Sequence, residues 1–207
     1  MKNKRRKIGN ILIITGLVML LGAAGLFIFN MYENNLYDEE SDGLTDIVKT
    51  HIGETSQSEQ TDSSDRQDAQ DAQDNAPGLK VQYVENASVD GILTIPAVNL
   101  EKAVYDTWND DLLRKSVCRY FGSPYTDDLV IAGHNYRNGF GKLKRLKAGD
   151  EVFFTDMKGN VTRYVVKQTE VIDGTDVTGM ISGGWHLSLY TCTYGGKARF
   201  TVRCMKE

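Results

Sequence analysis

The chain has 207 residues and a formal net charge of -4, but the charges are unevenly distributed. This length allows one domain of ordinary size with appendages. Residues 79–207 hold 17 basic and 15 acidic residues, so this part lacks the basic footprint of a nucleic-acid-binding protein. The three cysteines form no CxxC motif and no Cys/His cluster of zinc-ligand spacing, and we expect neither a metal nor a cofactor.

The N-terminus has the pattern of a membrane anchor. Five basic residues stand within 2–7, and the nineteen residues 11–29 carry no charge, which is enough for a helix to span a bilayer core. A secretory signal peptide is the alternative, but its apolar stretch is shorter and ends in small residues, whereas "GAAG" at 22–25 is followed by further apolar residues. We predict a cytoplasmic segment 1–10 and a transmembrane helix 11–29, with the rest of the chain outside the cell membrane.

Residues 30–78 are predicted to form an acidic, flexible extracellular spacer. Between Glu33 and Asn75 there are thirteen acidic residues and only two basic ones, Lys49 and Arg66. Such a polar stretch buries too little apolar surface to offset the entropy of ordering it. The folded domain is therefore expected at residues 79–207.

The first half of this domain shows the pattern of short strands. Residues 89–106 alternate between apolar and polar and are interrupted by Pro96 and Asn99, which predicts two strands with a bend. Residues 109–117 begin with helix-capping residues and predict a short helix. The apolar run Leu129–Ala132 is typical of a strand that is buried on both faces.

The second half continues in the same way. Apolar residues at helical spacing predict a helical segment near 140–146, and alternation in 152–155 and 162–166 predicts a hairpin. A glycine-containing connection at 173–184 leads to the last strands. Short strands with only brief helical segments indicate an all-β fold, either a barrel or a sandwich, with small surface helices.

The final hairpin brings a cysteine and an arginine together. If Gly195-Gly196 forms a two-residue turn, Cys192 lies opposite Arg199, and opposed side chains share a face with Cβ atoms about 4.5–5.5 Å apart. Another loop length would change this register. A guanidinium beside a thiol can stabilise the thiolate or a neighbouring oxyanion. The other two cysteines are Cys118 and Cys204, and no spacing rule decides whether they are bridged.

A cysteine nucleophile also needs a proton carrier, usually histidine. His51 lies in the polar spacer, and His186 is interpreted as a strand-edge residue. His134 follows the buried strand and opens a glycine-rich loop, a common place for catalytic groups. Each of these residues alone has an ordinary structural explanation, and the combination is more informative.

Three separated segments resemble the sortases, the membrane-bound cysteine transpeptidases of Gram-positive bacteria. They are Gly133-His134-Asn135, Ser188–Cys192 and Arg199–Arg203, in that order. The sortase hallmark is a T-L-x-T-C strand with an arginine opening the next strand. In "SLYTC", Ser188 replaces the first threonine, and the second threonine and the cysteine are kept. The similarity covers about residues 89–204.

The resemblance implies an eight-stranded sortase-type β-barrel and a catalytic trio. Cys192 would attack a sorting-signal carbonyl to form a thioacyl enzyme, His134 would protonate the departing amine, and Arg199 would stabilise the oxyanion. Arg203 also faces away from the core, and Arg199 is preferred because it opens its strand. Substrate contacts are expected at three nearby residues: Thr191, Ala132 and Asn135.

The implied partners are the sorting signals of secreted surface proteins, an amine acceptor of the cell wall and the membrane. The sequence has no Asp-Pro-aromatic lid and no long insertion before residue 187, which favours an anchoring, class A/D-like sortase over the pilin-polymerising and haem-pathway types. L,D-transpeptidases have their histidine two residues before the cysteine, and papain-like wall hydrolases have their cysteine first. The remaining alternative is a non-catalytic, membrane-tethered β-domain that binds a wall component or a partner protein.

Overall fold

The computed structural model describes residues 2–58 and 88–207. The chain divides into two compact units, residues 1–36 and 37–207. The first unit is the N-terminal part of α1 (Lys2–Ser58). Among the described residues, α1 is the one helix long and apolar enough to cross a membrane, and its apolar window has a mean hydropathy of 2.5. Large apolar side chains between Leu12 and Phe29 are exposed, as a segment in contact with lipid requires.

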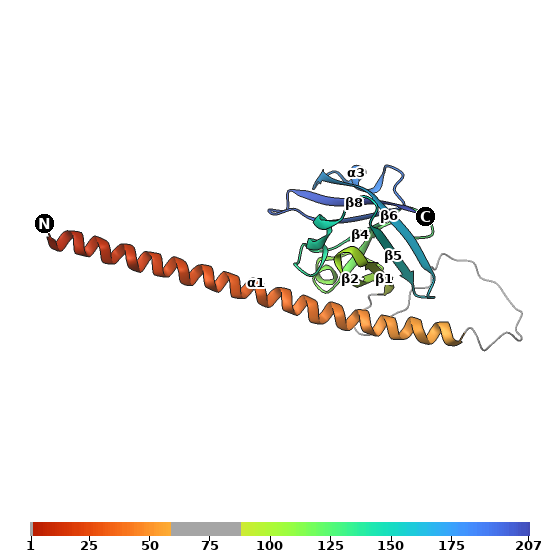
Figure 1. Ribbon diagram of the computed structural model, residues 1–207, viewed down its shortest axis with the longest axis horizontal. Helices are drawn as coiled ribbons and strands as arrows, with labels where there is room; N and C mark the ends of the chain where they lie inside the picture. Colours follow the sequence, from red (N-terminus) through yellow and green to blue (C-terminus); the bar gives the residue numbers. More distant parts are fainter. Residues whose placement is uncertain (1, 59–87) are drawn as a thin grey trace, which may run out of the picture. The chain divides into compact units, whose positions relative to one another are not determined.

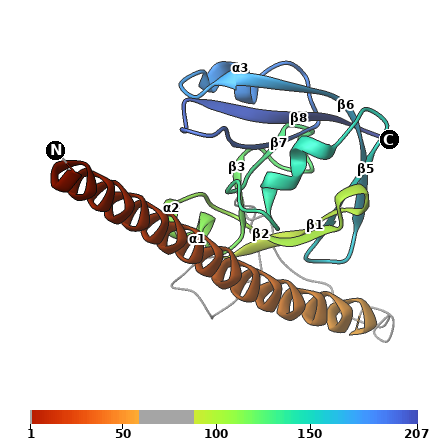
Figure 2. The same ribbon diagram turned by 60° about the vertical axis from the view of Figure 1, so that its left-hand side comes forward.

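The second unit contains a closed barrel of eight strands in the order β1-β2-β3-β4-β7-β8-β6-β5 (Figures 1 and 2). The strands are β1 (Val89–Ile95), β2 (Leu100–Tyr105), β3 (Val117–Phe121), β4 (Leu129–Ala132), β5 (Glu151–Asp156), β6 (Val161–Asp173), β7 (Leu187–Cys192) and β8 (Ala198–Lys206). The short helices are η1 (Pro96–Val98), α2 (Asp110–Leu113), η2 (Phe140–Arg145) and α3 (Val177–Ile181). The eight-stranded all-β barrel with short surface helices is therefore confirmed, and β3 is the strand that the sequence pattern did not predict.

Two apolar layers hold the barrel. Leu129 and Ile131 of β4 point into the barrel interior, whereas Val130 and Ala132 pack in a second cluster on its outside. All four residues are buried, as the continuous apolar run predicted. This double burial follows from the period of two along a strand, because each face of β4 meets its own apolar layer.

The predicted spacer is wrong for residues 30–58, because these residues are helical. Residues 59–78 of the predicted spacer lie outside the described residues. One side of α1 packs on the barrel through six buried residues at helical spacing: Tyr37, Ser41, Leu44, Thr45, Val48 and Ile52. Few apolar residues are needed for this contact, because each one faces the barrel. We call residues 37–52 the docked segment.

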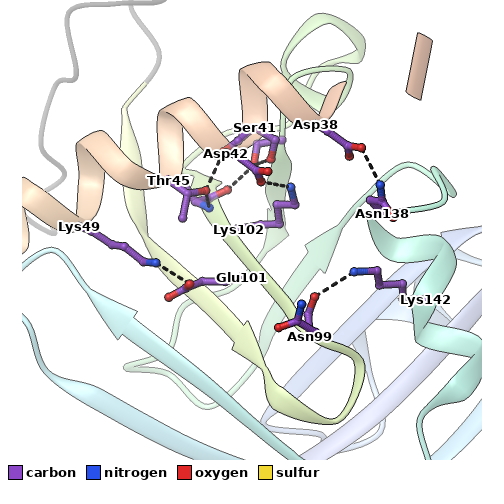
Figure 3. Close-up of polar contacts among 12 residues, drawn as sticks. Asp38, Ser41, Asp42, Thr45, Lys49, Asn99, Glu101, Lys102, Asn138 and Lys142 are labelled. Carbon is purple, nitrogen blue, oxygen red and sulfur yellow. Dashed lines mark hydrogen bonds and ion pairs between the residues drawn. The ribbon is translucent and has the colours of Figure 1, made fainter. Parts of the chain in front are cut away.

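The docked segment completes the hydrogen bonding of an open sheet edge (Figure 3). β2 pairs with β3 only from Val104 onward, so Ala103 has no strand partner on that side. Its N–H donates to Thr45 Oγ1 at 3.0 Å, and its carbonyl accepts from Ser116 Oγ at 2.6 Å. Ala103 is fully buried, so water cannot replace these partners, and the helix is an integral part of the folded domain.

Replacing Thr45 with valine is expected to lower the free energy of unfolding by about 1–3 kcal/mol, because the buried Ala103 N–H loses its acceptor. Urea unfolding followed by tryptophan fluorescence measures the change. Thr50→Val is the matched control: each hydroxyl donates to the carbonyl four residues earlier, Thr45 to Ser41 and Thr50 to Asp46, but Thr50 is exposed. We expect the control to change stability by less than about 0.5 kcal/mol, and equal effects of both variants would contradict the edge contact.

Candidate active site

The β7–β8 hairpin has the register that the sequence predicted. Cys192 is paired with Arg199. The Thr193 N–H donates to the Ala198 carbonyl at 2.9 Å, so the loop between these two residues runs over 194–197. Inside this loop the Gly196 N–H donates to the Thr193 carbonyl at 2.9 Å, which places Tyr194 and Gly195 at the centre of the turn. The predicted two-residue turn at Gly195-Gly196 is therefore wrong, although the pairing that it implied, Arg199 beside Cys192, is observed. Gly195 and Gly196 have φ values of 84° and 72°, which glycine adopts without strain.

The parallel pairing of β4 with β7 aligns the histidine with the same cysteine. The strands pair with a constant offset of 58 residues, from Leu129 with Leu187 to Ala132 with Tyr190. The Gly133 N–H continues the ladder by donating to the Tyr190 carbonyl at 3.1 Å. His134 and Cys192 differ by the same 58 positions. β4 and β8 lie on opposite sides of β7, so the backbone that continues from β4 to His134 lies on the side of β7 opposite Arg199.

Gly133 allows the backbone before His134 to pass close to the core. A Cβ atom on Gly133 would lie 2.5 Å from the ring of Phe140. Phe140 is fully buried in the barrel interior, so its ring has no room to retreat. A glycine before His134 thus lets the chain leave β4 directly over the core.

The three cysteines have different environments. Cys118 lies in the outer apolar cluster and Cys204 in the barrel interior, and no disulfide joins them. Burial raises the pKa of each of these two thiols to about 12, so both stay protonated at neutral pH. Cys192 is partly exposed at the end of β7. It is therefore the cysteine that a reagent or a substrate can reach.

A methanethiosulfonate reagent is expected to modify one thiol of the native protein, Cys192, about a hundredfold or more faster than the other two. The reason is that the attacking species is an accessible thiolate, which burial denies to Cys118 and Cys204. Intact-mass spectrometry measures the number of adducts over time. A Cys192→Ala variant that gains an adduct at the wild-type rate would contradict this assignment, and unfolding in urea should expose all three thiols.

Arg199 is partly buried beside the hairpin and is held by backbone carbonyls. Its Nη1 donates to the carbonyls of Gly196 at 2.9 Å and Ala198 at 3.3 Å. Within residues 88–207, Nε and Nη2 have no such protein partner, so they remain available to a ligand. Hydrogen bonds from Thr175 lower the pKa of Asp173, with a smaller contribution from the positive charge of Arg199.

Arg203 shares the strand face of Arg199 but has a structural environment. Its side chain is only 2% exposed. The guanidinium donates to four acceptors at 2.6–2.9 Å: Glu170 Oε1, Ser188 Oγ and the carbonyls of Gly179 and Met180. These bonds fasten α3 to the sheet. They leave Arg203 no capacity for a substrate, which favours Arg199 for that role.

An aromatic wall stands on the same strand face as Cys192. Tyr190, two residues before Cys192, packs edge-on against Tyr120 with ring centroids 5.4 Å apart, and Tyr120 packs edge-on against Trp108 at 6.1 Å. Trp108 is 44% exposed. The sequence pattern did not predict this wall, because Tyr120 lies on the unpredicted strand β3.

The other candidate residues lie in different surroundings. Thr191 and Ala132 are fully buried, so this arrangement does not support their predicted contact with substrate. Asn135 is partly exposed beside His134, and its contact stays a prediction. His186 lies at the opposite end of β7, where Nδ1 accepts from the Lys206 N–H at 3.1 Å. Within the described residues, no group of three or more His, Cys, Asp or Glu could hold a metal ion.

Comparisons with known proteins concern the family and the fold of the chain. The chain is 31% identical over 97 residues to sortase D of Bacillus subtilis (strain 168), a match covering 45% of the chain and 48% of the relative. The chain thus spans about half the length of the curated relative. The crystal structure of Listeria monocytogenes sortase A is 25% identical, covers 57% of this chain and 87% of its own, and has a TM-score of 0.52.

The barrel is also similar to that of sortase C from Clostridium perfringens SM101, at 22% identity and a TM-score of 0.53, over 89% of this chain and 98% of that one. At this identity the likeness concerns the fold alone. The relatives are named sortase A, C and D, so they support the family rather than the class A/D-like subtype. A family model described as a sortase domain matches residues 93–207, more than half of the chain, and this segment contains His134, Cys192 and Arg199. The chain belongs to the sortase family.

Proposed function

We propose that this protein is a membrane-anchored cysteine transpeptidase that cleaves a C-terminal sorting signal of secreted proteins and joins them to an amine of the cell wall. The observation that supports the proposal is the strand register: Cys192 pairs with Arg199 of β8, and the parallel pairing of β4 with β7, which Gly133 continues, leads to His134 on the other side of β7. A reactive thiol, a proton carrier and a cationic donor are the groups that acyl transfer requires. A binding module has no need for this combination.

In the proposed first step, the Cys192 thiol passes its proton to His134, and the sulfur attacks the backbone carbonyl carbon of the sorting signal. The carbonyl oxygen becomes an oxyanion, which the Arg199 guanidinium stabilises. The C–N bond then breaks, and His134 gives a proton to the departing amine. The product is a thioester on Cys192.

In the second step, an amine of the acceptor attacks the thioester carbonyl. His134 takes the proton from the incoming amine, and the Cys192 thiolate leaves as the new amide bond forms. The aromatic wall beside Cys192 limits water near the thioester and offers apolar surface to the bound peptide. Asn135 is the described candidate for a polar contact with that peptide.

The membrane topology follows from the basic N-terminus. Residues 2–7 hold five positive charges, which favour retention on the cytoplasmic side, so the barrel would lie outside. The proposed partners are therefore the sorting signals of exported proteins and a wall-precursor amine.

Within the family, we assign the protein to the anchoring sortases of class A/D type. Three observations support this assignment. The sequence has no Asp-Pro-aromatic lid. The connection between β6 and β7 holds only the five-residue helix α3. The identity with sortase D reaches 31%.

A test uses the full-length protein in detergent micelles with a library of sorting-signal peptides. We expect one peptide group to be cleaved and to leave an acyl adduct on Cys192, visible by intact-mass spectrometry. Hydroxylamine should release that adduct as a hydroxamate, as expected of a thioester. Cys192→Ala should form neither adduct nor product. If Cys192 reacts with a thiol reagent but no peptide is cleaved, and Cys192→Ala anchors surface proteins normally in cells, the binding-module alternative is correct.

A further inference from the structure

The start of the docked segment lies against the loop that carries His134. After Ala132 the chain leaves β4, and the ladder bond of Gly133 is the last one toward β7. The orientation of the His134 ring therefore depends on the loop that follows rather than on the sheet. Residues 136–139 form the turn of this loop, in which the Gly139 N–H donates to the Tyr136 carbonyl at 3.1 Å.

Two tyrosine rings connect the helix to the histidine. The Tyr37 ring packs against the Tyr136 ring at a centroid distance of 4.7 Å and an interplanar angle of 47°. The Tyr136 ring in turn packs against the His134 imidazole at 5.0 Å and 41°. Tyr37 is 2% exposed, so its position is fixed by the surrounding packing. Tyr37 thus fixes Tyr136, and Tyr136 lies directly on the imidazole.

Two further contacts of the helix hold the same turn. A Cβ atom on Gly139 would lie 3.0 Å from Tyr37 Oη, so the Tyr37 side chain rests on the backbone of Gly139. The next helix residue, Asp38, accepts a hydrogen bond from Asn138 Nδ2 at 2.6 Å (Figure 3). The turn is therefore held by ring packing at Tyr136 and Gly139 and by a polar bond at Asn138.

Contacts between the rest of the docked segment and β2 hold Tyr37 in place. Asp42 accepts from Lys102 at 2.7 Å and Lys49 donates to Glu101 at 2.5 Å, while Thr45 binds the edge of β2 (Figure 3). Lys102 Nζ also lies 5.2 Å from the centroid of the Tyr37 ring. The helix is anchored on β2 independently of the loop, so it can hold the loop in place.

We propose that Tyr37 is a positioning residue for His134, acting through Tyr136, and that Asp38 supports it through Asn138. The proposal rests on the proposed function, because it assigns the histidine a proton-transfer role. The docked segment would then set the imidazole orientation for proton transfer to and from the substrate amine. Loss of this contact leaves Cys192 and Arg199 in place, because both are positioned by the β7–β8 hairpin.

The experiment compares full-length variants in detergent micelles by NMR of carbon-13-labelled histidine and by steady-state kinetics. The chain has three histidines, and a His134→Gln variant assigns the His134 signal. Tyr37→Leu removes the aromatic contact but keeps an apolar side chain, and Tyr37→Phe restores the ring. Lys49→Ala is the matched control. It removes a contact between the same helix and Glu101, and it leaves the contacts between the helix and the His134 loop in place.

We expect Tyr37→Leu to shift the ring signal of His134 and to leave that of His186 unchanged. Its kcat should fall about tenfold to a hundredfold, because a small misplacement of a catalytic group is costly, and its KM should stay within about twofold. Tyr37→Phe should match the wild type in both measurements, and so should Lys49→Ala. Asn138→Ala, at an exposed residue, should shift the His134 signal in the same direction by a smaller amount.

Two results would overturn the proposal: an unchanged His134 signal in Tyr37→Leu, or an equal shift in Lys49→Ala. The second result would mean that any loosening of the helix disturbs the loop. If Tyr37→Leu does not fold, Asn138→Ala decides, and an unshifted His134 signal in that variant counts against the proposal. If the wild type cleaves no peptide, the proposed function fails, and the NMR comparison still decides whether Tyr37 orients the histidine.

Discussion

Replacing Arg199 with alanine is expected to lower kcat/KM for peptide cleavage about 10²–10³-fold, because the oxyanion loses its cationic hydrogen-bond donor. The fold should be unaffected, since Arg199 lies at the start of β8 and its observed bonds go to carbonyls of its own hairpin. Arg199→Lys should recover only part of the rate, because an ammonium lacks the planar fork of donors. The measurement is the initial rate of fluorogenic peptide cleavage, with the thermal midpoint measured in parallel.

Lys197→Ala is the matched control for this prediction. Lys197 is an exposed cation of the same hairpin, two residues before Arg199, and is not paired with Cys192. A general effect of positive charge on substrate attraction would appear in both variants and would weaken with salt. A specific effect appears in Arg199→Ala alone. A rate for Arg199→Ala within a few-fold of the wild type would remove Arg199 from the mechanism.

Replacing Arg203 with alanine is expected to lower the free energy of unfolding by about 2–4 kcal/mol. The guanidinium is buried and supplies donors to Ser188 and to the carbonyls of Gly179 and Met180. Without it these acceptors lose their partners, and the ion pair with Glu170 is lost. The expected loss of stability is smaller than for a fully buried ion pair, because the Glu170 side chain is 36% exposed and can be solvated.

Urea unfolding measures this loss, and Arg163→Ala is its control. Arg163 also forms ion pairs, with Glu151 and Glu207, but all three side chains are at least 40% exposed. Exposed pairs of this kind contribute little to stability, because solvent screens them and two long side chains must be held in one geometry. If Arg203→Ala is as stable as Arg163→Ala but inactive, Arg203 and not Arg199 is the arginine that acts on the substrate.

Strand periodicity does not distinguish Arg199 from Arg203. The period of two places Arg199 and Arg203 on one face of β8, and at that level they are equivalent. They differ because α3, a helix between β6 and β7, covers the end of the face that holds Arg203. Which part of a strand face is covered depends on where a remote segment packs. A pattern within the strand contains no information about that.

The sequence by itself determined the features that depend on neighbouring residues. The glycine pair after Cys192 located the hairpin and, with it, the pairing of Cys192 with Arg199, although the loop that forms runs over residues 194–197. The unbroken apolar run of Leu129–Ala132 identified the buried strand before His134. Alternation alone left a barrel and a sandwich as alternatives. The order of the motifs indicated the family, and the family implied the closed barrel.

Only the tertiary structure decided the features that join distant segments. The offset of 58 residues that brings His134 level with Cys192 depends on a parallel pairing with no local signal. The docked segment was predicted to be a spacer, because its few apolar residues stabilise a helix only when the barrel is present to receive them. The contact from Tyr37 through Tyr136 to His134 exists for the same reason. Packing between segments far apart in sequence is a property of the whole fold, so local propensity and periodicity do not contain it.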